Sequence, residues 1–217
     1  MLRYPQLPEA GVNPLEVIMH GMSDGLRDYL IESAQVLHAA SETIAQDAVN
    51  GAIDAVVMAL TAGKPLLVCG NGGSAADAGH ITGELVGRFL LERRALKAIC
   101  LSSEPAVLTS CGNDHGFESV FARQVEAYGE PGAVLLGLST SGNSANVVAA
   151  FEKARQIGMV TIALTGEGGG RLAPLADRLL AAPSLSTPLI QQVHLCIYHY
   201  LCREIECRMF SQTPARP

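Results

Sequence analysis

A short polar segment, Ser139-Thr-Ser-Gly-Asn-Ser144, carries the most distinctive chemistry of the sequence. It holds four hydroxyl side chains in six residues, and it lies between an apolar run and a segment with helical spacing. Backbone N–H groups at the start of a helix, together with hydroxyl groups, can satisfy the oxygens of a phosphate without a lysine. An ordinary helix N-cap would also account for a serine here, but a cap needs only one such residue. We therefore predict a phosphate site at residues 139–144.

A glycine-rich segment, Cys69-Gly-Asn-Gly-Gly-Ser74, is the second candidate for ligand binding. Glycines let a ligand approach the backbone closely, and a helix expected to begin near Ala75 would attract an anion. The match to the dinucleotide fingerprint is weak, because Ala75 stands where the third glycine would be and no acidic residue ends the next apolar run. Nucleotide binding is therefore the less favoured interpretation.

Two further turns carry polar or glycine residues. Asn113 and Asp114 lie in a polar cluster that could hydrogen-bond sugar hydroxyls, although asparagine, aspartate and glycine also favour a simple turn. Thr165-Gly-Glu-Gly-Gly-Gly170 is interpreted as a looser, flexible connection.

His80 and Glu84 are four residues apart on the helix expected after the glycine-rich segment. This spacing puts both side chains on one helix face, where they can share a metal ion or where Glu84 can act as a base. A solvated pair on a helix surface is the ordinary alternative. The short distance in sequence from the glycine-rich segment favours a functional pair.

The last helix carries Gln191, His194 and His199 among apolar residues. Polar groups on such a helix need partners once they are buried, so one histidine is expected to be a satisfied core or interface residue. Spacing alone does not say which one. A set of two histidines, a glutamate and a glutamine suits a borderline cation such as zinc.

The elements that must position these residues follow from hydrophobic patterning. Residues 1–13 hold two prolines and are expected to form a flexible arm, and residues 14–210 a single domain. Helical spacing from about residue 13 to residue 60 predicts two helices with a break near residues 47–51. Strands alternating with helices predict a parallel sheet covered on both faces, with ligands outside the carboxyl ends of the strands. The five predicted strands are 65–69, 96–101, 133–138, 159–164 and 178–182, and the closing helix is 187–208.

Composition argues against several classes of protein. The net charge is −6, and Arg93-Arg94 is the only adjacent basic pair, so neither nucleic acid nor a membrane surface is an expected partner. Residues 1–20 lack the features of a signal peptide, and the six scattered cysteines contain no CxxC pair. These observations predict a cytoplasmic protein with reduced thiols.

From about residue 24 to residue 208, the chain resembles the sugar-isomerase (SIS) domain proteins and, within them, the phosphoheptose isomerase family. The matching motifs occur in order: Cys-Gly-Asn-Gly-Gly-Ser74, His80-x-x-x-Glu84, Gly-Asn113-Asp114-x-Gly, Leu-Ser139-Thr-Ser-Gly-Asn-Ser144, and Ile-Gln191 followed by His199. The resemblance implies a flavodoxin-like three-layer α/β sandwich with N-terminal helices. It also implies a homotetramer with active sites between subunits and one Zn²⁺ per subunit.

The resemblance assigns roles residue by residue. The implied zinc ligands are His80, Glu84, Gln191 and His199. The implied substrate-binding residues are Asn71, Gly72, Gly73, Ser74, Arg88, Asn113, Asp114, Ser139, Thr140, Ser141, Ser144 and Gln191.

The implied reaction converts sedoheptulose 7-phosphate to D-glycero-D-manno-heptose 7-phosphate, the first step of bacterial ADP/GDP-heptose synthesis for lipopolysaccharide core or capsule. Glu84 would be the base that forms an enediol and His199 the general acid. Two alternatives stay open: a SIS relative that regulates assembly of the replication initiator, and an isomerase or sensor for another phosphosugar. The regulator lacks the glutamate that corresponds to Glu84, so the catalytic interpretation is preferred.

Overall fold

The structure, a computed structural model, describes residues 25–210 of the 217-residue chain. Its contacts divide the chain into two units, Met1–Gln35 and Val36–Pro217. In the described part of the first unit, residues 25–35, Gly25 precedes helix α2 and residues 26–35 form its beginning. The predicted arm at residues 1–13 and the predicted domain start at residue 14 lie outside the described residues, so these boundaries stay predictions.

From residue 46 onward in the described chain, at least one helix separates each strand from the next. The α-helices are α2 (Leu26–Thr43), α3 (Gln46–Thr61), α4 (Gly73–Val86), α5 (Pro105–His115), α6 (Val120–Tyr128), α7 (Ala145–Ile157) and α8 (Thr187–Phe210). The strands are β1 (Leu66–Gly70), β2 (Ala98–Cys100), β3 (Val134–Ser139), β4 (Val160–Thr165) and β5 (Arg178–Ala181). Short 3-10 helices cover Phe117–Ser119 and Gly170–Leu175.

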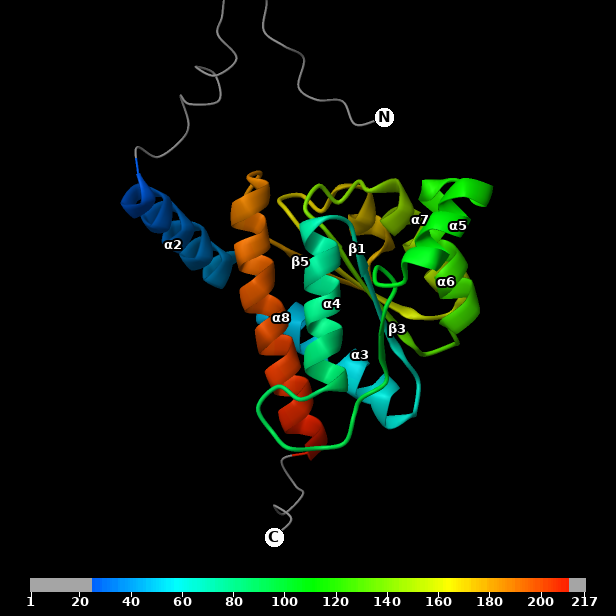
Figure 1. The fold of residues 1–217 in the computed structure, drawn as a ribbon. Helices are drawn as coiled ribbons and strands as arrows, with labels where there is room; N and C mark the ends of the chain where they lie inside the picture. Colours follow the sequence, from blue (N-terminus) through cyan, green and yellow to red (C-terminus); the bar gives the residue numbers. More distant parts are fainter. Residues whose placement is uncertain (1–24, 211–217) are drawn as a thin grey trace, which may run out of the picture. The chain divides into compact units, whose positions relative to one another are not determined.

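The five strands form one parallel sheet in the order β2-β1-β3-β4-β5 (Figure 1). All five predicted runs are strands, and each begins and ends within two residues of its predicted bounds. This strand order is that of the flavodoxin-like folds, in which ligands bind outside the carboxyl ends of the strands. The predicted fold class is confirmed.

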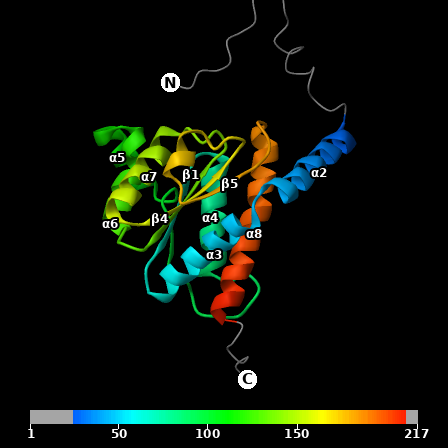
Figure 2. The same cartoon turned by 180° about the vertical axis from the view of Figure 1, so that it is seen from behind.

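The sheet separates two apolar cores. Leu66 and Val68 of β1 belong to a core shared with α3, α4 and α8, whereas Leu67 and Cys69 belong to a core shared with α6 and α7. Consecutive residues of a strand point to opposite faces, so a strand buried on both faces is apolar at every position. Seen from behind, α6 and α7 lie on one side of the sheet and α3 and α8 on the other (Figure 2).

The predicted break between the N-terminal helices is wrong in position. The chain leaves the helical conformation at residues 44–45, where Ala45 is extended with φ −64° and ψ 125°, and α3 continues through Asn50 and Gly51. Both residues are poor helix formers, yet the helix passes through them. A Cβ on Gly51 would lie 2.3 Å from Nε of Arg178 on β5, so the Arg178 side chain rests against this part of α3.

The closing helix α8 reaches Phe210, two residues beyond its predicted end. Pro188 lies in its first turn, where a missing backbone N–H is tolerated. Within residues 25–210, none of the helices combines the length and the apolar character needed to cross a bilayer.

Candidate functional site

The glycine-rich and hydroxyl-rich segments leave the carboxyl ends of neighbouring strands. β1 ends at Gly70 and β3 at Ser139, and Gly70 pairs with Leu138 in the sheet. Asn71 Nδ2 donates to Asn146 Oδ1 at 2.8 Å, and Asn146 Nδ2 donates to Asn71 Oδ1 at 2.9 Å. Asn146 lies in the first turn of α7, so this reciprocal amide pair joins the two segments.

The hydroxyl groups of the polar segment gather at the N-terminus of α7. Ser139 is buried, and its Oγ lies 2.9 Å from Ser144 Oγ and 3.5 Å from Ser141 Oγ. Ser144 occupies the N-cap position, yet its side chain makes no capping hydrogen bond. The N-cap interpretation therefore does not explain Ser144. The clustered hydroxyls and the positive end of the helix dipole form a suitable environment for an anion.

The segment Thr165–Gly170 is not the loose connection that its composition suggested. Gly166 N donates to Thr140 O at 3.0 Å, and Leu172 N donates to Gly142 O at 3.0 Å. Gly142 has φ +64°, and a Cβ there would lie 2.2 Å from Gly169 O. The segment is packed directly against residues 139–144 and supports them.

Gly142→Ala is expected to separate these two segments, and Gly168→Ala is a matched control. Both glycines have positive φ, +64° and +76°, so alanine is strained at either position by roughly 1–2 kcal/mol. Only at Gly142 would the new Cβ also meet backbone, since nothing lies within 4 Å of a Cβ at Gly168. We expect Gly142→Ala to lower the melting temperature further than the control does, and to weaken binding of inorganic phosphate measured by calorimetry. Equal effects of the two variants would contradict this packing.

A pocket of about 550 Å³ opens beside the polar segment. Its lining includes Thr140, Ser141, Glu167 and Thr187. Thr187 is the first residue of α8, and its Oγ1 lies 3.5 Å from Thr140 Oγ1. The hydroxyl-rich segment that precedes α7 and the N-terminal end of α8 therefore both border a space of the size that small-molecule ligands occupy. Glu167 and Thr187 were not among the predicted site residues.

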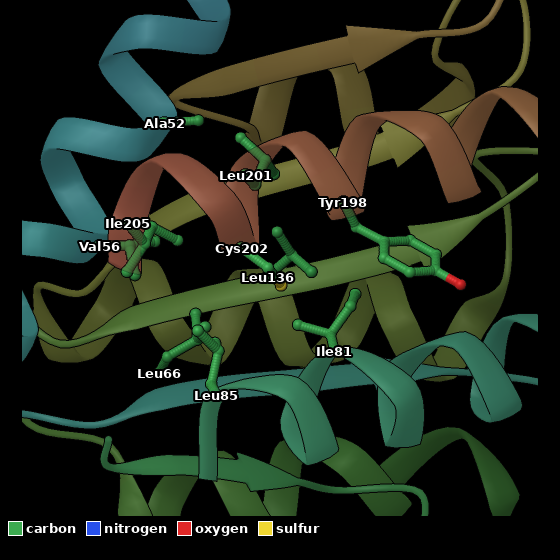
Figure 3. A pocket seen from close by; sticks show the side chains of 10 residues that line it. All are labelled: Ala52, Val56, Leu66, Ile81, Leu85, Leu136, Tyr198, Leu201, Cys202 and Ile205. Carbon is green, nitrogen blue, oxygen red and sulfur yellow. The ribbon is translucent and has the colours of Figure 1, made fainter. Parts of the chain in front are cut away.

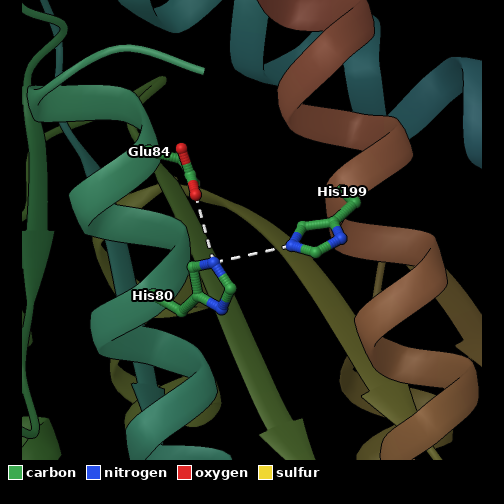
Figure 4. A group of neighbouring side chains, drawn as sticks. All are labelled: His80, Glu84 and His199. Carbon is green, nitrogen blue, oxygen red and sulfur yellow. Dashed lines mark hydrogen bonds and ion pairs between the residues drawn. The ribbon is translucent and has the colours of Figure 1, made fainter. Parts of the chain in front are cut away.

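Three side chains of the predicted metal set converge between α4 and α8 (Figure 4). His80 Nε2 lies 3.1 Å from Glu84 Oε1 and 3.5 Å from His199 Nε2. One ligand atom from each of the three residues lies within 4.8 Å of the others. His80 and Glu84 face the same side of α4 because they are one helical turn apart. α8 supplies His199 from the other side of the gap.

Two residues that the sequence did not reveal as candidates, Asp77 and Tyr198, lie on the Nδ1 side of His80. Tyr198 Oη lies 3.0 Å from His80 Nδ1 and donates to Asp77 Oδ1 at 3.2 Å. Burial raises the pKa of the Tyr198 phenol, and the neighbouring charge of Asp77 raises it further. Burial also raises the pKa of Asp77, while the Tyr198 hydrogen bond and His80 act to lower it. The position of Asp77, one turn before His80, was the available sequence signal.

The residues of this cluster fit the zinc ion that the resemblance implies. Two imidazole nitrogens and a carboxylate oxygen are ordinary zinc ligands, and catalytic zinc sites typically combine three protein ligands with an open position. His80, Glu84 and His199 would hold such an ion. The ion would polarise a substrate oxygen as a Lewis acid.

The remaining predicted metal ligand, Gln191, lies towards the other end of the site. A Cβ on Gly73 would lie 2.5 Å from Gln191 Nε2, so the amide rests against the start of α4. Eight residues separate Gln191 from His199, or about 12 Å along the helix axis. The structure thus brings Gln191 to the glycine-rich segment, where it can contact a ligand. Its role as a zinc ligand stays a prediction.

Arg88, Asn113 and Asp114 are exposed in this chain. Arg88 lies just beyond α4, and its Nε is 3.6 Å from Glu92 Oε2. Asn113 and Asp114 form the last turn of α5 rather than a separate turn, and Asn113 Nδ2 donates to Asp114 Oδ1 at 2.8 Å. Their contacts with a substrate stay predictions.

His194 is the core histidine of the last helix. It is fully buried, and its Nε2 lies 3.0 Å from Thr165 O at the end of β4, so Nε2 carries the hydrogen. Nδ1 has no hydrogen-bond partner among residues 25–210. Burial lowers the pKa of His194 to about 4, although the bond to Thr165 acts to raise it. The residue therefore anchors β4 as a neutral side chain.

Stability is expected to fall as the pH falls because of His194. The folded state keeps this imidazole neutral down to about pH 4, whereas an unfolded chain protonates it near the ordinary value of 6.5. Between these values the unfolded state binds more protons, so the free energy of unfolding decreases with decreasing pH, by roughly 3 kcal/mol over the window. His194→Gln keeps a donor for Thr165 but does not titrate. Denaturant unfolding between pH 7 and 4 should show a shallower pH dependence for His194→Gln, and identical slopes would contradict the assignment.

A buried ion pair between Arg93 and Glu206 lies at the C-terminal end of α4. Arg93 Nε lies 3.0 Å from Glu206 Oε1, and both side chains are 1% exposed. Arg93 Nη2 also donates to Glu84 O at 2.8 Å, and Nη1 donates to Leu85 O at 2.8 Å. These bonds satisfy carbonyl groups that the end of a helix leaves unpaired. The pair therefore fixes the helix turn that carries Glu84.

Comparisons with known proteins agree with this architecture. Residues 28–166 match the family model described as SIS domain. The phosphoheptose isomerase of Crocosphaera subtropica is 50% identical over 165 residues, which cover 76% of this chain and 84% of that protein. The phosphoheptose isomerase of Nitratidesulfovibrio vulgaris is 43% identical over 197 residues, covering 89% and 95%.

Solved structures give the same result. The phosphoheptose isomerase from Francisella tularensis has a TM-score of 0.81 and 38% identity, covering 85% of this chain and 98% of that one. The enzyme of the same name from Neisseria gonorrhoeae has a TM-score of 0.79 and 38% identity, covering 83% and 96%. Family model, sequence relatives and solved structures therefore agree that this chain belongs to the SIS domain family, among the relatives named phosphoheptose isomerase.

Proposed function

We propose that the chain is an aldose–ketose isomerase that converts sedoheptulose 7-phosphate to D-glycero-D-manno-heptose 7-phosphate with Zn²⁺. One observation carries the proposal. The same helix, α4, begins beside the hydroxyl-rich segment 139–144 and bears His80 and Glu84, which meet His199 of α8. The relatives named phosphoheptose isomerase supply the reaction class and the substrate.

The spacing along α4 suits a long sugar phosphate. Gly73, at the start of the helix, belongs to the glycine-rich segment, which the Asn71–Asn146 pair joins to the hydroxyl-rich segment's side of the sheet. His80 is seven residues further along, or about 10 Å along the helix axis. When the phosphate is bound at the strand ends, an extended sugar can therefore place its carbonyl end at the metal cluster. This separation favours a seven-carbon chain over a triose.

The hydroxyl-rich segment 139–144 binds the phosphate, and the cluster of His80, Glu84 and His199 carries out the proton transfers. Ser139, Ser141 and Ser144 hold the phosphate and so place the other end of the sugar. Glu84 removes the proton from C1 of the ketose, and a general acid, His199, protonates the oxygen on C2 to give an enediol. Return of a proton to C2 and loss of the proton from the C1 hydroxyl yield the aldose. Zinc, when bound, stabilises the negative charge that develops on the substrate oxygens.

Glu84 has two proposed roles, metal ligand and base, and its carboxylate has an oxygen for each. Oε1 faces His80 Nε2 at 3.1 Å. Oε2 makes no hydrogen bond to the part of the chain that the structure describes. One oxygen can therefore meet the cation while the other takes the substrate proton.

The subunit arrangement and cellular setting belong to the same proposal. We place the reaction in the cytoplasm, as the first step of bacterial ADP/GDP-heptose synthesis, in a homotetramer with active sites between subunits. Val86 and Leu90 are 45% and 61% exposed just beyond Glu84, and Leu195 is 38% exposed on α8. Apolar side chains grouped around a site in this way suit burial against a second subunit.

A substrate panel tests the proposal. Purified protein with its zinc content measured would be given sedoheptulose 7-phosphate and, separately, fructose 6-phosphate, with product identified chromatographically. We expect turnover of the heptulose phosphate that is lost after zinc removal by a chelator and restored by added zinc. Turnover of the hexulose phosphate instead would favour the isomerase for another phosphosugar. Binding of the heptulose phosphate without turnover would favour a non-catalytic regulator.

A further inference from the structure

The hydrogen bonds around Tyr198 determine which nitrogen of His80 carries a hydrogen. A phenol has one hydrogen to donate, and Tyr198 donates it to Asp77 Oδ1 at 3.2 Å. Tyr198 Oη can then only accept at its 3.0 Å contact with His80 Nδ1. His80 Nδ1 must therefore be the N–H donor, which leaves the lone pair of a neutral imidazole on Nε2.

Packing of the Tyr198 ring fixes the position of its hydroxyl group. Tyr198 is 1% exposed and belongs to the core shared by α3, α4 and α8. Its ring forms one end of a small apolar cavity of about 10 Å³, and the hydroxyl points away from the other lining side chains (Figure 3). Ile81 and Leu85 of α4 and Leu201 of α8 also line this cavity. A ring packed in this way has little freedom to turn its hydroxyl away from His80.

The lone pair of His80 Nε2 faces the carboxylate of Glu84, whose Oε1 is 3.1 Å away. His199 Nε2 lies 3.5 Å away, and its tautomer decides whether it donates or accepts there. Lone pairs brought this close repel one another unless a cation lies between them. We propose that Asp77 and Tyr198 are positioning residues that fix His80 in its Nδ1–H form, so that Nε2 is ready to bind a metal before the metal arrives.

This inference rests on the proposed zinc function for its significance, but its structural content is tested separately. Zinc ligation through Nε2 requires a hydrogen on Nδ1, and an oxygen acceptor behind the imidazole strengthens the ligand. Tyr198→Phe keeps the ring and removes only the acceptor. Tyr200→Phe is the matched control, because the Tyr200 ring lies over Arg203 and its phenol makes no hydrogen bond within the described residues.

The first measurement is zinc affinity by competition with a chromophoric chelator. We expect Tyr198→Phe to bind Zn²⁺ roughly 10- to 100-fold more weakly than the wild type, and Tyr200→Phe to match the wild type. The melting temperatures of the metal-free proteins separate a loss of fold from a loss of affinity. Affinity for Tyr198→Phe within twofold of the wild type would overturn the inference.

The second measurement determines the tautomer of the His80 imidazole. ¹⁵N NMR of the metal-free protein, well above the ordinary histidine pKa of about 6.5, reports which ring nitrogen carries the hydrogen. We expect His80 to be the Nδ1–H form in the wild type. In Asp77→Ala, the freed Tyr198 O–H can donate to Nδ1, so the hydrogen should move to Nε2. An Nε2–H form in the wild type, or no change in Asp77→Ala, would overturn the inference.

The two readouts distinguish failure of the inference from failure of the proposed function. A wild type that shows the Nδ1–H form but binds no zinc would remove the metal from the proposed function and keep the tautomer assignment. A wild type that binds zinc and isomerises the substrate, with the same zinc affinity in Tyr198→Phe, would remove the positioning role and keep the function.

Discussion

Glu84→Gln is expected to abolish isomerisation while leaving the fold intact. The substitution keeps the size of the side chain and removes the only carboxylate among the three clustered residues His80, Glu84 and His199. General base catalysis contributes roughly a hundred- to ten-thousandfold to a proton transfer, so the turnover number should fall by at least that range. The measurement is the initial rate of aldose formation, together with zinc content, which separates loss of the base from loss of the ion.

Glu204→Gln provides the matched control for this variant. Glu204 lies on α8, its side chain is 24% exposed, as is that of Glu84, and it pairs with Arg203 at 3.1 Å. The control should retain the wild-type rate. Turnover by Glu84→Gln at a rate comparable to that of Glu204→Gln would rule out Glu84 as the base.

Arg93→Met is expected to destabilise the protein more than any other single change considered for α4. It leaves the carboxylate of Glu206 buried without its positive partner, which typically reduces the free energy of unfolding by about 3–5 kcal/mol. Burial acts to raise the pKa of Glu206, but the N–H groups of residues 89–91 and the charge of Arg93 hold this pKa below its ordinary value. The loss should appear as a decrease of roughly 10 °C in melting temperature.

Arg88→Met is the control for Arg93→Met. Arg88 and Glu92 form an exposed ion pair in the same segment, with side chains 61% and 89% exposed. Exposed pairs contribute about 0–1 kcal/mol, so the control should leave the melting temperature nearly unchanged. A melting temperature for Arg93→Met close to that of the control would show that the buried pair does not stabilise the end of α4.

Acidification should weaken the same pair. Because the folded-state pKa of Glu206 is lowered, its contribution to stability is present above the ordinary carboxyl value and is lost as the pH falls through the folded-state value. This acid effect lies at lower pH than the beginning of the His194 effect. Glu206→Gln would remove the first and keep the second.

Hydrophobic patterning was sufficient to predict the sheet but not every helix boundary. Each buried strand is a short apolar run, and burial on both faces makes such a run stand out in the sequence. The break predicted near residues 47–51 was misplaced, because α3 continues through Asn50 and Gly51 although both are poor helix formers. Gly51 lies against the side chain of Arg178, which belongs to the last strand and is far away in sequence.

The candidate site was predictable where its chemistry is local. His80 and Glu84 are one turn apart, and the hydroxyls of residues 139–144 are consecutive, so their proximity follows from helix and loop geometry. The Asn71–Asn146 and Arg93–Glu206 contacts join residues 75 and 113 positions apart, and neither pair has a local signal. Tyr198 resembled any core aromatic residue until its hydroxyl was seen to reach His80 and Asp77.

The most direct measurement of the central claim is an NMR assay of sedoheptulose 7-phosphate with the purified zinc-loaded protein in D₂O. Proton abstraction by Glu84 through an enediol predicts an aldose 7-phosphate that carries deuterium at C2, because the proton returned to that carbon exchanges with solvent in the open site. An unchanged ketose after incubation with folded, zinc-loaded protein would contradict the account, and would leave the chain as a phosphosugar-binding protein without isomerase activity.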